Sequence, residues 1–330
     1  MTNEISRARL LRAIPLALVG AALLMGGVSA QAQAWPAKPV RLVVSYPPGG
    51  TVDAVARIVA PKLSAKLGQP VVIDNRGGAG GAIGGDLVAK SSPDGYTVLL
   101  DASNHAQNPA LRKMPFDTLR ELAPVSLLVK VPNVLVVNPS APMKNVADLI
   151  AQAKAKPGGI NYASSGNGSA QHLAGELFAS MAGVQMTHVA YKGGGPALTD
   201  VMSGHVPVFF ASMASSLPFI QGGKLRALAV TGKAHAPALP QLPTVAQAGL
   251  PGYEVYEWNA VFVPAGTPAP VVERLSKELA ATLKDPEVRG RLEALGAEVI
   301  GSSPAELDGF RRAEITKWTK LAKDNKIQMD

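Results

Sequence analysis

The chain has 330 residues, no cysteine, and a formal net charge of +8 from Lys and Arg residues scattered along its length. The absence of cysteine excludes a disulfide framework, thiolate chemistry and a lipobox. No basic stripe with interleaved aromatic residues is present, so we expect no nucleic-acid partner.

The first 34 residues have the pattern of an export signal. Arg7, Arg9 and Arg12 precede a short apolar stretch, and residues 30–34 (A-Q-A-Q-A) offer A-x-A cleavage sites. The apolar stretch is too short to span a membrane. We predict cleavage of this signal peptide (1–34) after Ala34 and export to the periplasm. The remaining chain is long enough for two domains.

Along the mature chain, short β-branched runs alternate with amphipathic segments, which is typical of an α/β protein with largely parallel sheets. In the first part, strands are predicted at residues 40–46, 71–73 and 97–100, and a helix at 52–67. A glycine-rich stretch at 77–85 precedes another helix. This stretch lacks both the dinucleotide-binding spacing and the Lys-Ser or Lys-Thr of a P-loop, so we interpret it as close backbone packing.

Two long extended segments interrupt this alternation. The segment 125–137 contains Pro132 and suits a strand crossing between domains better than a central strand. The segment 253–263 resembles a return crossing. Between them the alternation of strands and helices continues, and from Pro268 the chain is mostly helical. Two crossings predict a discontinuous α/β domain (35–130 and 257–330) and a continuous one (131–256).

Three predicted strand-to-helix loops share one chemistry. Residues 48–51, 165–169 and 192–195 are rich in glycine and hydroxyl or amide side chains, and each precedes a helix. The first N–H groups of a helix lack intrahelical acceptors and favour a carboxylate or phosphate. One such loop could be plain helix capping, but three favour ligand binding. The predicted contacts are Gly49, Gly50, Thr51, Ser103, Asn104, Ser165, Gly166, Asn167, Gly168, Ser169, Tyr191 and Lys192.

Some residues near these loops have two interpretations. Asp53 is assigned a structural role at its helix start, because an acid facing an anionic ligand would repel it. Lys192 is either a counter-charge for the ligand or a solvated side chain. Ser103, Asn104 and His105 either contact a ligand or form a turn with its own Asx-type bonds.

Signatures of catalysis are thin. Ser169, His172 and Glu176 would share one helical face, from which a relay through both imidazole nitrogens is difficult, and no G-x-S-x-G elbow is present. The histidines show no zinc-binding spacing. We predict a protein that is not an enzyme and has no cofactor and no metal site. An exported hydrolase, with turnover dependent on Ser169, is the alternative.

Short motifs in a fixed order extend along the mature chain. They are Y-P-P-G-G-T-V-D at 46–53 with Arg57, N-R-G-G-A-G-G at 75–81, P-D-G-Y-T at 93–97, S-G-N-G-S at 165–169 with His172, Y-K-G at 191–193, L-P-T-V at 242–245 and P-A-G-T-P at 264–268. Together they resemble the motifs of the Bug-type extracytoplasmic solute receptors, the substrate-binding proteins of tripartite tricarboxylate transporters.

The resemblance implies a type II periplasmic-binding-protein-like fold, with two α/β lobes, a ligand cleft and two crossing strands. It implies that loop amides and hydroxyls hold a small carboxylate ligand, partly through ordered waters, for delivery to membrane permease subunits. A ligand sensor for a signalling partner would share these residues. We expect a monomer. Residues 206–211 lack the acidic side chains that the family often carries there, which favours an acid without an ammonium group.

Overall fold

The computed structural model describes residues 35–325 and 327. The chain divides into two units, Met1–Ala37 and Lys38–Asp330, and the fold described below is that of the second unit. The predicted signal peptide, residues 1–34, lies outside the described residues. No helix in the described part of the chain is long and apolar enough to cross a membrane.

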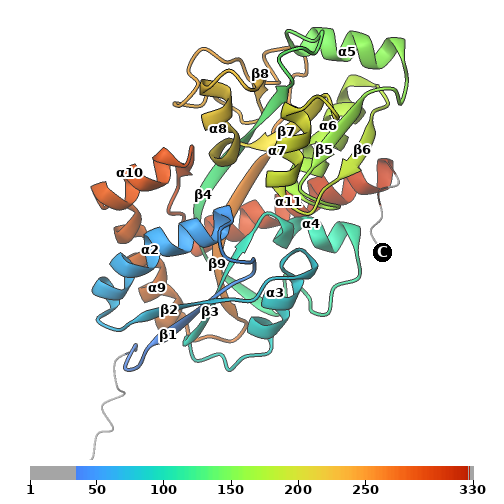
Figure 1. The fold of residues 1–330 in the computed structure, drawn as a ribbon. Coiled ribbons are helices and arrows are strands. Elements are labelled where there is room, and N and C mark those ends of the chain that lie inside the picture. Colours follow the sequence, from blue (N-terminus) through green and yellow to red (C-terminus); the bar gives the residue numbers. More distant parts are fainter. Residues whose placement is uncertain (1–34, 326, 328–330) are drawn as a thin grey trace, which may run out of the picture. The chain divides into compact units, whose positions relative to one another are not determined.

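The unit Lys38–Asp330 alternates strands with helices and so confirms the α/β class (Figure 1). The elements are β1 (Val40–Val44), α2 (Thr51–Leu67), β2 (Val71–Asn75), η1 (Ala79–Gly81), α3 (Ala82–Ala89), β3 (Thr97–Ala102), α4 (Asn104–Leu111), β4 (Leu122–Val137), α5 (Val146–Ala155), β5 (Asn161–Ser164), α6 (Ala170–Ala182), β6 (Thr187–Ala190), α7 (Gly194–Met202), β7 (Val208–Ser212), α8 (Met213–Gln221), β8 (Arg226–Val230), β9 (Tyr256–Pro264), α9 (Ala269–Leu283), α10 (Pro286–Ala294), β10 (Glu298–Val299) and α11 (Pro304–Asp324).

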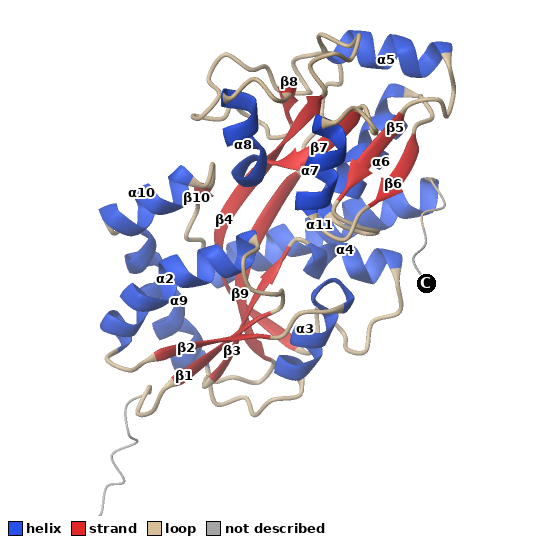
Figure 2. Ribbon diagram, viewed as in Figure 1, coloured by secondary structure: helices blue, strands red, loops and turns tan. Residues whose placement is uncertain are grey.

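The strands pair in the order β2-β1-β3-β9-β4-β7-β5-β6, and β8 and β10 also pair with β4. Strand β1 is parallel to β2 and β3, and β5 is parallel to β6 and β7. The long strands β4 and β9 are antiparallel to each other and join these two parallel groups. Figure 2 shows helices on both faces of the strands. Loops that follow strands of both parallel groups lead into helices, as the alternation predicts.

Strand β4 lies inside the sheet, so the prediction that its proline disfavours a central strand is wrong. Pairing with β9 continues to Pro132, and pairing with β7 begins at Asn133. Pro132 therefore lies where β4 changes its pairing partner from β9 to β7. Because a proline has no N–H to donate, it is tolerated at this junction between two sets of strand hydrogen bonds. The domain boundaries, residues 130/131 and 256/257, stay a prediction.

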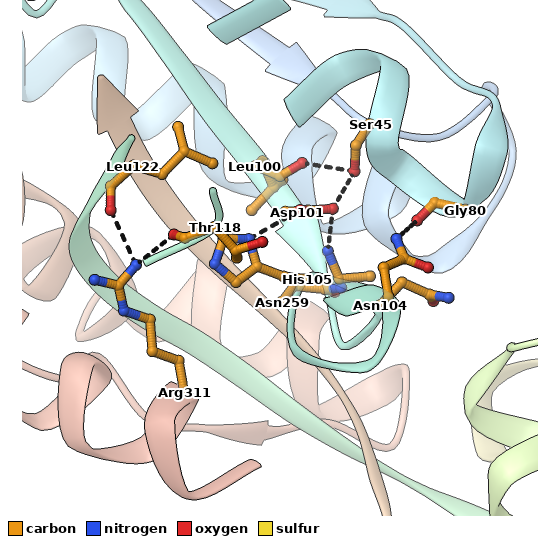
Figure 3. Close-up of polar contacts among 12 residues, drawn as sticks. Ser45, Gly80, Leu100, Asp101, Asn104, His105, Thr118, Leu122, Asn259 and Arg311 are labelled. Atoms are coloured by element: carbon orange, nitrogen blue, oxygen red, sulfur yellow. Dashed lines mark hydrogen bonds and ion pairs between the residues drawn. The ribbon is translucent and has the colours of Figure 1, made fainter. Parts of the chain in front are cut away.

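A buried arginine connects the last helix to the beginning of β4. Arg311 of α11 is 2% exposed, and its Nη1 donates to the carbonyl oxygens of Thr118 at 3.1 Å and Leu122 at 2.9 Å (Figure 3). Its guanidinium also pairs with Asp308. Because a buried charge is costly without partners, these bonds hold α11 to β4 in one geometry.

One helical glycine is required by the close packing of α6 on β5. Tyr162 of β5 is fully buried, and a Cβ added to Gly175 would lie 2.2 Å from Cε2 of that ring. The same ring packs edge-on against Phe210 of β7 at 6.2 Å. Since the ring is enclosed on several sides, only a residue without a side chain fits at position 175.

Gly175→Ala is expected to lower the free energy of unfolding by about 1–3 kcal/mol, because overpacking displaces Tyr162. Gly309→Ala is the matched control, since that exposed glycine of α11 has no atom within 4 Å of the added Cβ. There the substitution should raise stability by about 0.5–1 kcal/mol. Urea unfolding measures both effects, and an unchanged Gly175→Ala variant would contradict the close contact.

Candidate ligand-binding site

A cavity of about 680 Å³ lies among the loops that follow β1, β3, β5, β6 and β7. It is lined by Tyr46, Gly49, Gly50, Thr51, Val52, Ala54, Gly80, Ala102, Ser103, Asn104, Ser165, Gly166, Asn167, Ser169, Ala170, Gln171, Gly193, Gly194, Gly195, Phe209, Ser212, Ala214, Ser215, Glu257 and Leu295. Its volume is within the range of small-molecule sites, about 300–1,000 Å³. The three loops predicted to bind a ligand meet here.

Most of the predicted contacts line this cavity. They are Gly49, Gly50, Thr51, Ser103, Asn104, Ser165, Gly166, Asn167 and Ser169. Gly168, Tyr191 and Lys192 do not line it, and the third loop contributes Gly193, Gly194 and Gly195 instead. The role of all these residues in binding stays a prediction.

Four helices begin at the cavity without a side-chain cap. No side chain caps the first turn of α2, α4, α7 or α8, whose N-cap residues are Gly50, Ser103, Gly193 and Ser212. Helix α6 differs, because the Ser169 hydroxyl accepts a hydrogen bond from His172 N at 3.2 Å, which confirms the capping role of Ser169. Uncapped helix starts concentrate N–H donors and positive dipole ends around the cavity.

A buried carboxylate organises the first of the three loops. Asp53 Oδ2 accepts from Gly49 N at 2.9 Å and from Arg57 Nε at 2.8 Å, and Oδ1 accepts from Asn75 Nδ2 at 3.0 Å. Burial raises the pKa of Asp53, but the donors from Arg57, Gly49 and Asn75 outweigh it and hold the pKa below its ordinary value. Asp53 is therefore an ionised structural residue, as the sequence indicated.

Asn104 connects loops that are far apart in the sequence. Its Nδ2 donates to the Gly168 carbonyl at 2.7 Å, and its Oδ1 accepts from the Tyr46 hydroxyl at 2.8 Å. The sequence analysis interpreted residues 103–105 either as ligand contacts or as a turn. In the structure β3 continues to Ala102 and α4 begins at Asn104. Asn104 thus begins a helix, and its side chain bonds to a distant loop instead of closing a local turn.

His105 lies in a buried polar cluster next to the cavity. Its Nδ1 is 3.2 Å from Asp101 Oδ2, and Ser45 Oγ donates to Asp101 Oδ1 at 2.6 Å (Figure 3). The imidazole stacks on Phe262 with ring centroids 3.9 Å apart, and burial lowers its pKa. Ser45 and His105 both bond to the carboxylate, so this trio lacks the serine–imidazole bond of a hydrolase.

Two stacked histidines support the loop at residues 164–169. The rings of His172 and His188 are 3.9 Å apart. Gly168 N donates to His172 Nδ1 at 3.1 Å, while His188 Nε2 lies 2.6 Å from the Ser164 hydroxyl, which accepts from Gly166 N at 3.0 Å. Burial, together with His172, lowers the pKa of His188 to about 4, so that imidazole is neutral at pH 7. A neutral imidazole at position 188 can accept the proton of the Ser164 hydroxyl.

The residues Ser169, His172 and Glu176 are not arranged as a catalytic triad. Ser169 Oγ accepts from the backbone N of His172, and His172 Nδ1 is occupied by Gly168 N. Glu176 accepts from the Tyr162 hydroxyl and lies 3.6 Å from His172 Nε2. These contacts fix the helix start instead of activating a nucleophile. Among the described residues, no three His, Asp or Glu side chains are grouped to hold a metal ion.

Tyr191 and Lys192 lie beside the cavity but outside its lining. The Tyr191 hydroxyl donates to Asp200 Oδ2 at 2.7 Å, and burial together with Asp200 raises its pKa to about 12. Lys192 is exposed. A contact from either residue to a ligand stays a prediction.

Glu257 of β9 is the acidic residue of the cavity lining, and the sequence analysis missed it, as it missed Tyr46, Gln171, Ser212 and Ser215. Burial raises the pKa of Glu257 to about 7, against a smaller lowering effect of the Thr51 side chain. Two further polar atoms that line the cavity, Ser103 Oγ and Ser212 Oγ, are buried without a hydrogen-bond partner within the protein. A glutamate inside a mainly apolar strand was the available signal, because such a residue needs a polar environment.

The fold and the cavity define a solute receptor of the periplasmic-binding-protein type. The family model described as "Tripartite tricarboxylate transporter family receptor" (TctC) matches residues 55–327. Protein BugT of Bordetella pertussis is 38% identical over 314 residues, which cover 94% of this chain and 96% of BugT. The chain belongs to the TctC family of receptors, and the resemblance seen in its motifs is confirmed.

Solved structures agree in fold. Rpa4515 of R. palustris with adipate has a TM-score of 0.81 and 40% identity, covering 89% of this chain and 99% of that one. The periplasmic binding protein BugD has a TM-score of 0.79 and 35% identity, covering 90% and 100%. MatC from Rhodopseudomonas palustris with bound malate has a TM-score of 0.77 and 31% identity, covering 87% and 99%. The predicted type of fold is therefore confirmed.

His188→Gln is expected to weaken the pH dependence of stability between about pH 6.5 and 4. The folded-state pKa of His188 is lowered from 6.5 to about 4, so acid protonates this group first in the unfolded chain. Stability present above pH 6.5 is therefore lost as the pH falls toward 4. Urea unfolding at pH 7, 5.5 and 4 measures the loss.

Glutamine at position 188 keeps an acceptor for the Ser164 hydroxyl but does not titrate in this range. Its loss of stability in acid should therefore be smaller than in the wild type. His205→Gln, at an exposed position, is the control and should follow the wild type. Equal acid sensitivity of His188→Gln and the wild type would show that His188 is not held neutral.

Proposed function

We propose that this protein is a periplasmic receptor that binds a small organic acid through its carboxylate and delivers it to the membrane permease subunits of a tripartite transporter, without turnover. The observation that carries the proposal is the convergence of uncapped helix starts on one cavity, at Gly50, Ser103, Gly193 and Ser212. Adipate in Rpa4515 and malate in MatC support a carboxylate as the ligand class.

The energetics favour several loops acting together. A hydrogen bond to a charged group contributes about 1.5–3 kcal/mol, and a helix terminus about 0.3–1 kcal/mol. A micromolar dissociation constant corresponds to about 8 kcal/mol, after the costs of association. The donors of one loop would not supply this free energy of binding. The donors of the loops that follow β1, β3, β5 and β6 would supply it together.

The proposed contacts come from both parallel groups of strands. Residues 49–51, 103 and 104 follow β1 and β3, whereas residues 165–169 and 193–195 follow β5 and β6. We further propose that these groups belong to the two domains predicted from the crossings, residues 35–130 with 257–330 and residues 131–256. A ligand held by both sets of loops would then be enclosed between the domains and shielded from water, which strengthens charge-assisted hydrogen bonds.

A thermal-shift screen of six acids tests the proposal: acetate, benzoate, succinate, adipate, malate and citrate. An acid present at 100 times its Kd should raise the free energy of unfolding by about 2.7 kcal/mol. Glucose and calcium chloride serve as uncharged and cationic controls. The proposed ligand class is wrong if none of the acids shifts the melting temperature and a control does.

Gly166→Ala is expected to weaken binding of the best acid at least tenfold, or about 1.4 kcal/mol. Gly166 has a φ of +129°, and an added Cβ would lie 3.2 Å from the Tyr191 carbonyl oxygen, so the loop must change shape. Gly158→Ala is the matched control, because that glycine has a φ of +71° but lies outside the cavity lining.

Titration calorimetry of the two variants separates strain from recognition. Both substitutions place a side chain in left-handed backbone, so both should lower stability. Only Gly166→Ala should alter the dissociation constant. Equal affinities of the two variants would remove this loop from the binding site while leaving the other loops in place.

A further inference from the structure

The cavity of this anion receptor carries a carboxyl group and no fixed cation. Glu257 is the acid among the lining residues, which include neither Lys, Arg nor His. Tyr46 is the other titratable side chain there. An ionised Glu257 would share a small volume with the carboxylate of the ligand, and like charges at close range disfavour each other. The two charges therefore need a proton or a cation between them.

Several cations on the elements around Glu257 are paired elsewhere. On α2, Arg57 Nε is 2.8 Å from Asp53, and on α3, Lys90 pairs with Asp86. On β4, the residue opposite Glu257 is Val131, and the ammonium of the neighbouring Lys130 lies over the rings of Tyr256 and Phe310. Helix α8 contains no titratable residue. The titratable and charged groups of the surrounding elements and loops are Tyr46, Asp53, Arg57, Lys62, Lys66, Asp86, Lys90, Asp101, His105, Arg112, Lys130, Tyr191, Lys192, Tyr256 and Glu298, and no lysine or arginine among them lines the cavity.

Burial is the main cause that favours a neutral Glu257. Asp101 is bonded to Ser45 and His105, and Tyr46 interacts electrostatically with both Asp101 and Glu257. Burial raises the pKa of Glu257 to about 7. At neutral pH about half of the ligand-free molecules therefore carry the protonated acid. A protonated carboxyl group has one O–H donor, and its bond to a carboxylate is short and strong.

We propose that Glu257 is a ligand-binding residue of this cavity, which binds as the neutral acid and donates its O–H to a carboxylate oxygen of the ligand. The inference rests on the proposed function, since it assumes that the cavity holds an organic acid. The proton comes from solvent, and no covalent bond forms or breaks. Each binding event above the pKa of the free protein then takes up one proton.

The matched variants are Glu257→Gln and Glu298→Gln. Glutamine keeps the size of the neutral acid and an N–H donor, but does not titrate. Glu298 is an exposed residue of β10 outside the cavity lining, so its variant controls for loss of a charge. The probe is whichever of acetate, benzoate, succinate, adipate, malate and citrate gives the largest thermal shift.

Titration calorimetry at pH 6 and pH 8.5 gives the expected result. Binding to the wild type should be about 30-fold weaker at pH 8.5, because only the protonated fraction of Glu257 is competent. Glu298→Gln should show the same ratio. Glu257→Gln should bind at pH 6 within a few fold of the wild type and lose nearly all of the pH dependence. The ligand's own titration is common to all three proteins and cancels in this comparison.

Proton uptake by the wild type provides a measurement that does not depend on a variant. Calorimetry at pH 8 in two buffers of different ionisation enthalpy should give close to one proton taken up per ligand. Release of protons, or a Glu257→Gln variant that no longer binds at pH 6, would show an ionised Glu257 paired with a cationic group. That result overturns the inference and leaves the proposed function intact. Failure of every acid to bind the wild type at either pH overturns the proposed function itself.

Discussion

The pairing of β4 with two different sets of neighbours is the constraint on which the rest of the structure depends. One part of this strand is bonded to β9, and the part after Pro132 is bonded to β7 and β8. Strand β4, together with its neighbour β9, therefore joins the parallel groups β1–β3 and β5–β7 into one sheet. Because loops at the carboxyl ends of strands from both groups reach the same cavity, the binding site is a consequence of this sheet topology.

In the function proposed above, the cavity would hold negative charge with dipoles more than with ions, because no lysine, arginine or histidine lines it. The arginine on the first helix, Arg57, is paired with Asp53. Backbone N–H groups at helix starts cost little to desolvate compared with a buried lysine. Glycine at positions such as 50 and 193 brings these groups to the cavity without intervening side chains. A site of this kind is preorganised before any ligand enters.

Much of this arrangement could be predicted because local sequence patterns determine it. Glycine and small polar residues after apolar runs identified the loops at 48–51 and 165–169, and helical spacing identified α2. Helix α4 was missed because it is short, contains Pro109 and is rich in polar residues. Its register with the sheet places Asn104 against Gly168, a pairing across many residues that no local pattern encodes.

Glu257 shows a second limit of sequence reasoning. The strand around it was recognised as a crossing segment, but which face of a strand borders a cavity is decided by tertiary packing. The same holds for Tyr191 and Lys192, which precede the glycines of the third loop but do not line the cavity. Backbone elements follow local rules, whereas the side chains that give a site its selectivity are placed by contacts between distant segments.

The hydrogen bond between Asn104 and the Gly168 carbonyl belongs to a set of contacts that occupy carbonyl oxygens of the loops around the cavity. A bare carbonyl oxygen would present negative potential and attract metal ions or amines. Here Asn104 Nδ2 donates to the Gly168 oxygen, Ser169 N to that of Gly166, and Asn108 Nδ2 to that of Gly80. At these three residues the carbonyl oxygens are occupied, so in the proposed function they would attract a cation less than bare carbonyls would.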